Sequence, residues 1–284
     1  MWKTIGSTVI IMFFMVPAFA ETMVIRHIRP SAKDNRLAYR LEVLTLALNK
    51  AKVSYQLVPV ESPMPISRAF IETNQANPTL DIISSQTSLE REKLLRPIRF
   101  PIDRGVMGCR VFLVRQQDQN LFQDVKNLED LKKFSFGFMK SWLDTELFQA
   151  VGLKVVFASK YENLFEMVAA GRFSAFSRSV AEVSMEKKTF STPQRPLVIE
   201  ENLMLQYPAA EYFFVRQTDE KLYNAVYSGL ATAFKDGSFL KLFDRYYADE
   251  FSALKMKKRR VIKIPNPLLP PQVMEVDPKW WYYK

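Results

Sequence analysis

Cysteine and histidine are almost missing from this sequence of 284 residues, which contains one of each, Cys109 and His27. A single cysteine cannot form an intramolecular disulfide, and a single histidine cannot supply a histidine-rich metal site. A serine-histidine-aspartate relay would have to use His27 itself. These shortages exclude disulfide-stabilised scaffolds and many classes of enzyme, and no metal or other cofactor is expected.

The sequence has a positive net charge, but its content of charged residues is ordinary. The chain has 40 Lys and Arg against 30 Asp and Glu, a net charge of +10, but its charged fraction of 25% is ordinary. The bias does not demand a nucleic-acid partner, and we expect none. The apolar content of 48% excludes disorder and is enough for about two domains of roughly 150 residues each.

Long apolar runs are confined to the N-terminus. A cationic start at Lys3 precedes the apolar run Val9–Val16 and the small-x-small site Ala18-Phe19-Ala20. This order predicts a cleavable signal peptide over residues 1–20. The alternative is an uncleaved membrane anchor, but the run is shorter than the ~20 residues that span a bilayer.

Short apolar strands alternate with amphipathic helices over the rest of the chain. Asp34 is placed to cap a helix whose inward stripe is Leu37, Leu41, Leu44 and Leu48, and the segments 23–27 and 55–60 on either side are extended and apolar. A β-α-β order of this kind is typical of parallel sheets covered by helices. A further helix is expected over 66–74 and a strand over 80–83.

A second α/β unit follows residue 120. Strands are predicted at 134–138 and 153–157, Asn127 is placed to cap a short helix, and Ser159 with Glu162 fits a capping box before a helix that Gly171 ends. Two apolar runs, 105–115 and 207–216, flank this unit. A long helix is then expected over 219–235, with Leu222, Val226, Leu230 and Ala233 facing inward.

The C-terminal tail differs in composition. Residues 253–263 are rich in Lys and Arg without an acid, and five prolines and the aromatic run Trp280-Trp-Tyr-Tyr283 follow. The prolines exclude an α-helix there. We expect a strap whose aromatic side chains pack in a groove of the first lobe and whose charges are solvated. The alternative is contact with anionic lipid headgroups or cell-wall polymers.

One block of residues resembles a known family. Leu80-Asp81-Ile-Ile-Ser-Ser85 ends a strand, Ser88-Leu-Glu-Arg91 follows, and then come Phe100-Pro101-Ile102 and Gly105. This order is similar to that of the family 3 solute-binding proteins of bacterial amino-acid ABC importers. Weaker similarities at 127–131, 164–173 and 236–247 extend the resemblance over nearly all of the chain after the leader.

The resemblance implies a two-lobed periplasmic-binding-protein fold of type 2, an α/β architecture with mixed sheets, helices on both faces and two crossover strands within 105–115 and 207–216. Lobe 1 would comprise 21–110 and 211–254, lobe 2 would comprise 111–210, and 255–284 would form the strap. The resemblance also implies a monomeric periplasmic protein that binds a small solute, an amino acid or other small carboxylate. Its membrane partner would be a permease or a sensor.

The family's carboxylate-gripping arginine corresponds to Arg91, with Ser84 and Gln86 on the same loop. Lobe 2 departs from the family, because Lys140-Ser141-Trp142-Leu143-Asp144 replaces its Gly-Thr loop, and Ser174 and Ser179 stand where it has acids for an ammonium. Arg178 adds a positive charge beside them. The predicted ligand-binding residues are Arg91, Ser84, Gln86, Trp142, Asp144, Arg178 and Ser179. Unless Asp144 or Glu182 points into the cleft, a free ammonium is disfavoured there.

Other roles stay open at this stage. A dehydratase-like periplasmic enzyme on the same scaffold would need a general acid or base, for which Asp144, Glu182 and His27 are the candidates. A protein that kept the fold, lost its ligand and contacts the cell envelope is a third reading. Arg26, Arg29 and Arg68 border the expected cleft, and Cys109 is expected to be a buried, inert side chain.

Overall fold

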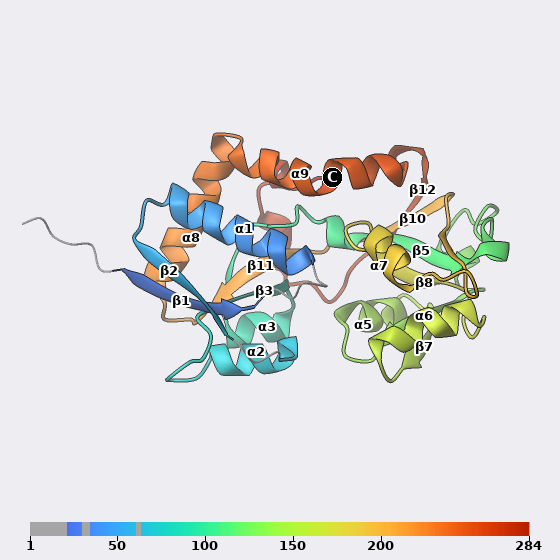
Figure 1. Ribbon diagram of the computed structural model, residues 1–284, viewed down its shortest axis with the longest axis horizontal. Helices are drawn as coiled ribbons and strands as arrows, with labels where there is room; N and C mark the ends of the chain where they lie inside the picture. Colours follow the sequence, from blue (N-terminus) through green and yellow to red (C-terminus); the bar gives the residue numbers. More distant parts are fainter. Residues whose placement is uncertain (1–21, 30–34, 61–63, 284) are drawn as a thin grey trace, which may run out of the picture.

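The chain forms two lobes side by side (Figure 1), and the computed structural model describes residues 22–29, 35–60 and 64–283. The predicted signal peptide and the predicted capping residue Asp34 lie outside the described residues. Within the described residues, no helix is both long and apolar enough to cross a membrane.

Lobe 1 combines a parallel pair of strands with an antiparallel sheet. Its strands β1 (Met23–Ile28) and β2 (Tyr55–Val60) are parallel, as the β-α-β pattern predicts, and β11 (Glu211–Val215) lies between β3 (Ile82–Gln86) and β4 (Arg96–Ile98). Its helices are α1 (Asn35–Lys50), α2 (Ile66–Thr73), α3 (Leu89–Leu94), α8 (Glu220–Lys235) and α9 (Ser238–Ala253).

The main helix contact of lobe 1 is between α1 and α8. All the inward residues predicted for α8 are buried, and Gly229 lets the two backbones approach, because a Cβ there would lie 1.9 Å from the carbonyl oxygen of Ala47. Any larger residue at this position would push the helices apart. This contact closes the core of lobe 1 around Leu44 and Leu48.

Lobe 2 is built around one mixed sheet. The strand order is β12 (Arg260–Lys263), β10 (Leu203–Gln206), β5 (Cys109–Arg115) and β8 (Phe176–Ser179), and β9 (Leu197–Ile199) also pairs with β5. The parallel strands β6 (Ser135–Met139) and β7 (Lys154–Ala158) adjoin it through a bridge between Phe136 and Ala175. The helices are α4 (Leu128–Leu131), α5 (Leu143–Ala150), α6 (Tyr161–Ala169) and α7 (Val183–Phe190).

The helix ends of lobe 2 agree with the sequence in two of three cases. Asn127 caps α4, because its Oδ1 accepts from the backbone N–H of Asp130 at 3.0 Å, and Gly171 has φ +67°, the left-handed conformation that ends α6. The capping box at Ser159 and Glu162 is wrong. The N-cap is Lys160, so the box is out of register by one residue, and the Ser159 hydroxyl instead accepts from the Asn163 side chain at 3.2 Å.

Two chain segments cross between the lobes before the C-terminal tail. The first runs from Asp103 to Cys109 through a 3₁₀ turn, Val106–Gly108, and the second runs from Gln206 to Glu211. Cys109 is buried at the first crossing, and burial raises the pKa of its thiol to about 12. The thiol is therefore protonated and unreactive at neutral pH, as expected of a packing residue.

The tail attaches to both lobes, which the sequence did not predict. After α9 it enters lobe 2, where β12 pairs in parallel with β10 and Ile262 and Ile264 join the core. It then returns to lobe 1, where Val273 and Val276 are buried. Near its end, the backbone N–H of Tyr282 donates to the carbonyl oxygen of Arg104 on the first crossover at 2.8 Å.

The tail's aromatic residues pack into lobe 1. The Trp280 ring lies 4.6 Å from that of Phe100, and the Tyr282 ring lies 5.1 Å from that of Phe251 (centroid distances). The basic run is not uniformly solvated. Arg259 is only 7% exposed and donates to the carbonyl oxygens of Leu254 at 2.8 Å and Leu203 at 3.1 Å, so it joins the end of α9 to lobe 2.

Packing of the tail can be tested with two adjacent substitutions. Val273 is fully buried and Met274 is 72% exposed. We expect Val273→Ala to lower the free energy of unfolding by about 2 kcal/mol and Met274→Ala to change it by less than ~0.5 kcal/mol. Deleting 265–284 should lower the free energy of unfolding further still. Urea denaturation measures all three effects, and equal stabilities for the two point variants would mean that the tail is not packed.

Candidate functional site

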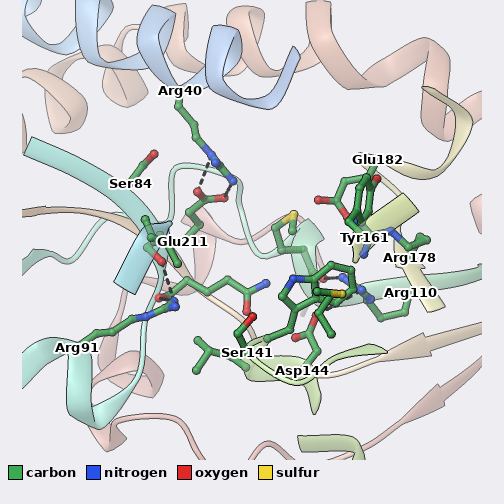
Figure 2. Close-up of a pocket in the computed structure, with 17 residues that line it drawn as sticks. Arg40, Ser84, Arg91, Arg110, Ser141, Asp144, Tyr161, Arg178, Glu182 and Glu211 are labelled. Carbon is green, nitrogen blue, oxygen red and sulfur yellow. Dashed lines mark hydrogen bonds and ion pairs between the residues drawn. The ribbon is translucent and has the colours of Figure 1, made fainter. Parts of the chain in front are cut away.

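A cavity of about 430 Å³ lies between the two lobes and receives side chains from both (Figure 2). Lobe 1 contributes the end of β3 and the start of α3, together with Arg40 and Glu211. Lobe 2 contributes the loop before α5 and residues from β8 and α6. Its charged lining residues are Arg40, Arg91, Arg110, Asp144, Arg178, Glu182 and Glu211.

Arg91 lies in the first turn of α3, which Ser88 caps through its hydroxyl. Its Nη1 donates to the Ser85 hydroxyl and to the carbonyl oxygen of Gln86, both at 2.7 Å, and its guanidinium lies 5.3 Å from the centre of the Phe70 ring. Burial lowers the pKa of Arg91. Among the described residues, no carboxylate forms an ion pair with Arg91, and neither its Nη2 nor its Nε has a hydrogen-bond partner.

The other lobe 1 arginine of the cavity is paired. Arg40 on α1 contacts both carboxylate oxygens of Glu211 on β11, with Nε 2.5 Å from Oε1 and Nη2 2.9 Å from Oε2. Glu211 is only 2% exposed. This bidentate pair fastens α1 to the second crossover and neutralises both charges. Sequence reasoning missed both residues, and the signal was the lone carboxylate at the start of the buried run 211–215.

Arg178 is enclosed by two carboxylates. Its Nη2 lies 2.7 Å from Glu182 and 2.6 Å from Glu186, and its Nε donates to Glu186 at 2.6 Å. All three side chains are buried. Although burial opposes the charged form, Glu182 and Glu186 raise the pKa of Arg178. Glu182 is the member of this cluster at the cavity wall.

Arg110, the second lobe 2 arginine of the cavity, lies at the start of β5. Its Nη2 is 3.3 Å from Asp144 and donates to the carbonyl oxygen of Ser177 at 3.0 Å, while Nη1 donates to that of Met107 at 3.3 Å. The side chain is 1% exposed. It joins the first crossover, β8 and the N-terminal turn of α5, so Asp144 faces the cavity with its charge already matched.

The structure brings together most of the predicted ligand-binding residues. Ser84, Gln86, Arg91, Trp142, Asp144 and Arg178 all line the cavity. Trp142 stacks on Phe176, with ring planes 9° apart and centroids 6.2 Å apart, so its indole belongs both to the packing and to the cavity wall. Asp144 and Glu182 both line the cavity, so the condition under which the sequence allowed an ammonium there is met.

Other candidates lie elsewhere. Ser179 is fully buried, and its hydroxyl donates to the carbonyl oxygen of Val106 at 3.1 Å. His27 is also buried outside the cavity, with Nδ1 2.9 Å from the carbonyl oxygen of Ile28. Lys140 is exposed. None of Arg26, Arg29 and Arg68 lines the cavity, and Arg26 is paired with Asp81 at 2.7 Å.

A second cavity, of about 530 Å³, lies between the crossovers and the tail. Its lining is mainly apolar and comes from Gly105, 206–209 and 263–283. Over the described residues, no group of three or more His, Cys, Asp and Glu side chains is arranged to hold a metal ion.

No family model and no curated protein matches this sequence. Solved structures of similar shape include a double mutant of the BvgS VFT2 domain from Bordetella pertussis, with a TM-score of 0.58 and 17% identity, covering 79% of this chain and 93% of that one. Another is a putative binding component of an ABC transporter from Wolinella succinogenes in complex with lysine, at 0.56 and 16%, covering 80% and 96%.

A third similar structure is an ancestral amino-acid-binding protein, described as a precursor of cyclohexadienyl dehydratase, with a TM-score of 0.54 and 15% identity, covering 80% of this chain and 95% of that one. At these identities the likeness shows the fold. The chain has the two-lobed fold of the periplasmic binding proteins, and the fold predicted from its resemblance to the family 3 proteins is confirmed.

The pairing of Arg178 makes a testable prediction. Arg178→Ala removes the guanidinium that is paired with the buried Glu182 and Glu186, so we expect it to lower the free energy of unfolding by about 3–5 kcal/mol at pH 7. The deficit should shrink at pH 5, where protonation can relieve the buried charges of the variant. Urea denaturation measures it, and the exposed Arg172→Ala in the same lobe is the control. Equal, small losses for the two variants would contradict the pairing.

Proposed function

We propose that this protein is a periplasmic solute-binding protein that captures a small carboxylate-bearing solute, in particular an amino acid, between its two lobes. The observation that carries the proposal is the contrast among the cavity's arginines. Arg40, Arg110 and Arg178 are each matched by a carboxylate, whereas no carboxylate in the described part of the chain forms an ion pair with Arg91, which also lines the cavity.

Arg91 is suited to the carboxylate of the solute. Its two internal hydrogen bonds use Nη1 alone, which fixes the guanidinium plane and leaves Nη2 and Nε to bind. A guanidinium binds a carboxylate through two parallel hydrogen bonds. The neighbouring Ser84 and Gln86 line the same wall and supply uncharged polar groups.

The lobe 2 wall is suited to a cationic group. Glu182 and Glu186 both contact the Arg178 guanidinium, and the Glu182 carboxylate also lines the cavity. Glu182 thus takes the role of the acids that Ser174 and Ser179 replace. An arginine on the lobe 1 wall and a carboxylate on the lobe 2 wall suit a zwitterion, and the lysine complex of the similar Wolinella succinogenes protein supports this choice.

A solute that touches both walls favours closure, because it contacts lobe 2 only when the lobes approach. The closed form would then be recognised by an ABC importer or a membrane sensor. The predicted leader over 1–20 supports a periplasmic location, and the chain is expected to act as a monomer.

Loss of the Arg91 guanidinium should abolish binding. We expect a thermal-shift screen of residues 21–284 against amino acids, dicarboxylates and oxo acids to find a stabilising solute, since a ligand at 100 times its Kd contributes about 2.7 kcal/mol. Arg91→Ala should lose this stabilisation and keep the Tm of the ligand-free protein. Arg68→Ala, an exposed arginine of the same lobe, is the control, and retained binding in Arg91→Ala would remove Arg91 from the site.

The cationic half of the site has its own test. For matched pairs such as leucine and 4-methyl-2-oxopentanoate, we expect the amino acid to bind at least 10-fold more tightly by calorimetry. Glu182→Gln should reduce this preference while the oxo acid still binds, because one charge-assisted contact is worth about 1.5–3 kcal/mol. Tighter binding of the oxo acid to the unmodified protein would contradict the proposal of a zwitterionic solute. It would still be consistent with a carboxylate-binding site at Arg91.

A second candidate function is a dehydratase-like enzyme on this scaffold. It is favoured by the similar ancestral protein described as a dehydratase precursor and by the two carboxylates, Asp144 and Glu182, at the cavity wall. Both are engaged by arginines, and His27 lies outside the cavity. Recovery of the bound solute unchanged supports the binding protein, whereas turnover supports the enzyme. If no solute binds, a ligand-free envelope protein is favoured.

A further inference from the structure

One buried carboxyl group lies where both crossovers meet. Asp103 is 3% exposed, and its Oδ1 accepts from the backbone N–H groups of Gly105 at 3.0 Å and Glu211 at 3.4 Å. Its Oδ2 accepts from the backbone N–H of Met107 at 3.0 Å. Gly105 and Met107 belong to the first crossover and Glu211 ends the second, so a single side chain fastens two of the segments that join the lobes.

The same residues reach the cleft. Met107 and Glu211 donate to Asp103 through their backbones, and their side chains line the cavity. Glu211 in turn holds Arg40, another lining residue. A second backbone link, from the N–H of Ile102 to the carbonyl oxygen of Glu211 at 2.9 Å, makes the joint rigid. Any change at Asp103 is therefore transmitted to the cavity wall.

We propose that Asp103 is a positioning residue of the hinge, and that gain or loss of its proton sets how freely the lobes close around the solute. This regulation rests on the proposed function, because it acts on the same cleft. The carboxylate accepts hydrogen bonds from both crossovers, whereas the protonated carboxyl carries an O–H and is a weaker acceptor. Ionisation therefore stiffens the joint, and protonation loosens it.

The groups around Asp103 bring its protonation into the physiological pH range. Burial and the nearby Glu211 raise the pKa of Asp103 to about 7, against the lowering effect of its three backbone donors. The groups that face it from other elements are Tyr39 of α1, Tyr212 of β11, Tyr247 of α9 and Cys109 of β5, while Arg104 follows it in the chain and Arg40 is held by Glu211.

The three tyrosines and the cysteine that face Asp103 stay neutral between pH 5.5 and 8.5. Burial raises the pKa of Tyr39, Tyr212, Tyr247 and Cys109, so none of them ionises between pH 5.5 and 8.5. The sign for stability follows from the raised pKa of Asp103. The folded protein holds this proton more tightly than the unfolded chain, so this contribution to stability is complete below about pH 4 and is lost as the pH rises to about 7.

The hinge can be tested without a ligand. Spin labels are attached to cysteines that replace the exposed residues Arg68 in lobe 1 and Lys140 in lobe 2, with Cys109 left buried. The interlobe distance is then measured by pulsed electron paramagnetic resonance at pH 5.5 and 8.5. We expect a narrow distribution at pH 8.5 that broadens toward shorter distances at pH 5.5.

Asp103→Asn should give the same distribution at both pH values, since it cannot titrate. The control is Asp124→Asn, the same substitution at an exposed site far from the hinge, which should keep the pH response. An unchanged response in Asp103→Asn, or no response in the parent protein, would overturn the proposal.

If Asp103→Asn does not fold, hydrogen exchange of the parent protein decides. After correction for intrinsic rates, protection of the Gly105, Met107 and Glu211 amides should fall at least 10-fold from pH 8.5 to 5.5, whereas the strand amide of Phe213 should not change. Equal behaviour of all four amides would contradict the proposal. A titrating hinge in a protein that binds no solute would refute only the proposed function, and solute binding without a titrating hinge would refute only this inference.

Discussion

The cleft depends on one constraint, which is that a guanidinium removed from water must be matched by a carboxylate. Three of the four arginines around the cavity obey it, and each pair joins two elements. Arg40 and Glu211 join α1 to β11, Arg110 and Asp144 join β5 to α5, and Arg178 with Glu182 and Glu186 joins β8 to α7. The walls are thus shaped by charge matching, and the unmatched Arg91 stands out against them.

A small number of contacts also holds the first crossover in place. The first crossover is held from within by Asp103 and from outside by the tail, where the carbonyl oxygen of Arg104 accepts from Tyr282 and Trp281 packs on Gly105. A Cβ at Gly105 would lie 2.6 Å from the Trp281 ring, so glycine is required at this crossing. Because β12 is paired with lobe 2, the tail forms a further connection between the lobes and limits how far they can twist apart.

The alternation of strands and helices predicted the α/β architecture because it depends on local patterns. The two lobes and the place of Arg91 at the cleft were implied by the resemblance to the family 3 proteins, and the structure shows two lobes with Arg91 in the cavity lining. Arg40 and Glu211 are 171 residues apart, so only tertiary structure joins them. Ser179 was expected in the site, but β8 alternates its side chains, and since Arg178 faces the cavity, Ser179 faces the first crossover.

Charge placement in lobe 2 shows why a missing motif residue is a weak argument. Ser174 and Ser179 suggested that no acid was left for an ammonium, and Arg178 suggested added positive charge. In the folded chain, Glu182 and Glu186 follow Arg178 by four and eight residues and surround it, so its positive charge is matched. Arg91 lines the cavity from lobe 1 and Glu182 lines it from lobe 2. The proposed zwitterion would contact both walls at once, which would couple its binding to closure more directly than the binding of a simple anion.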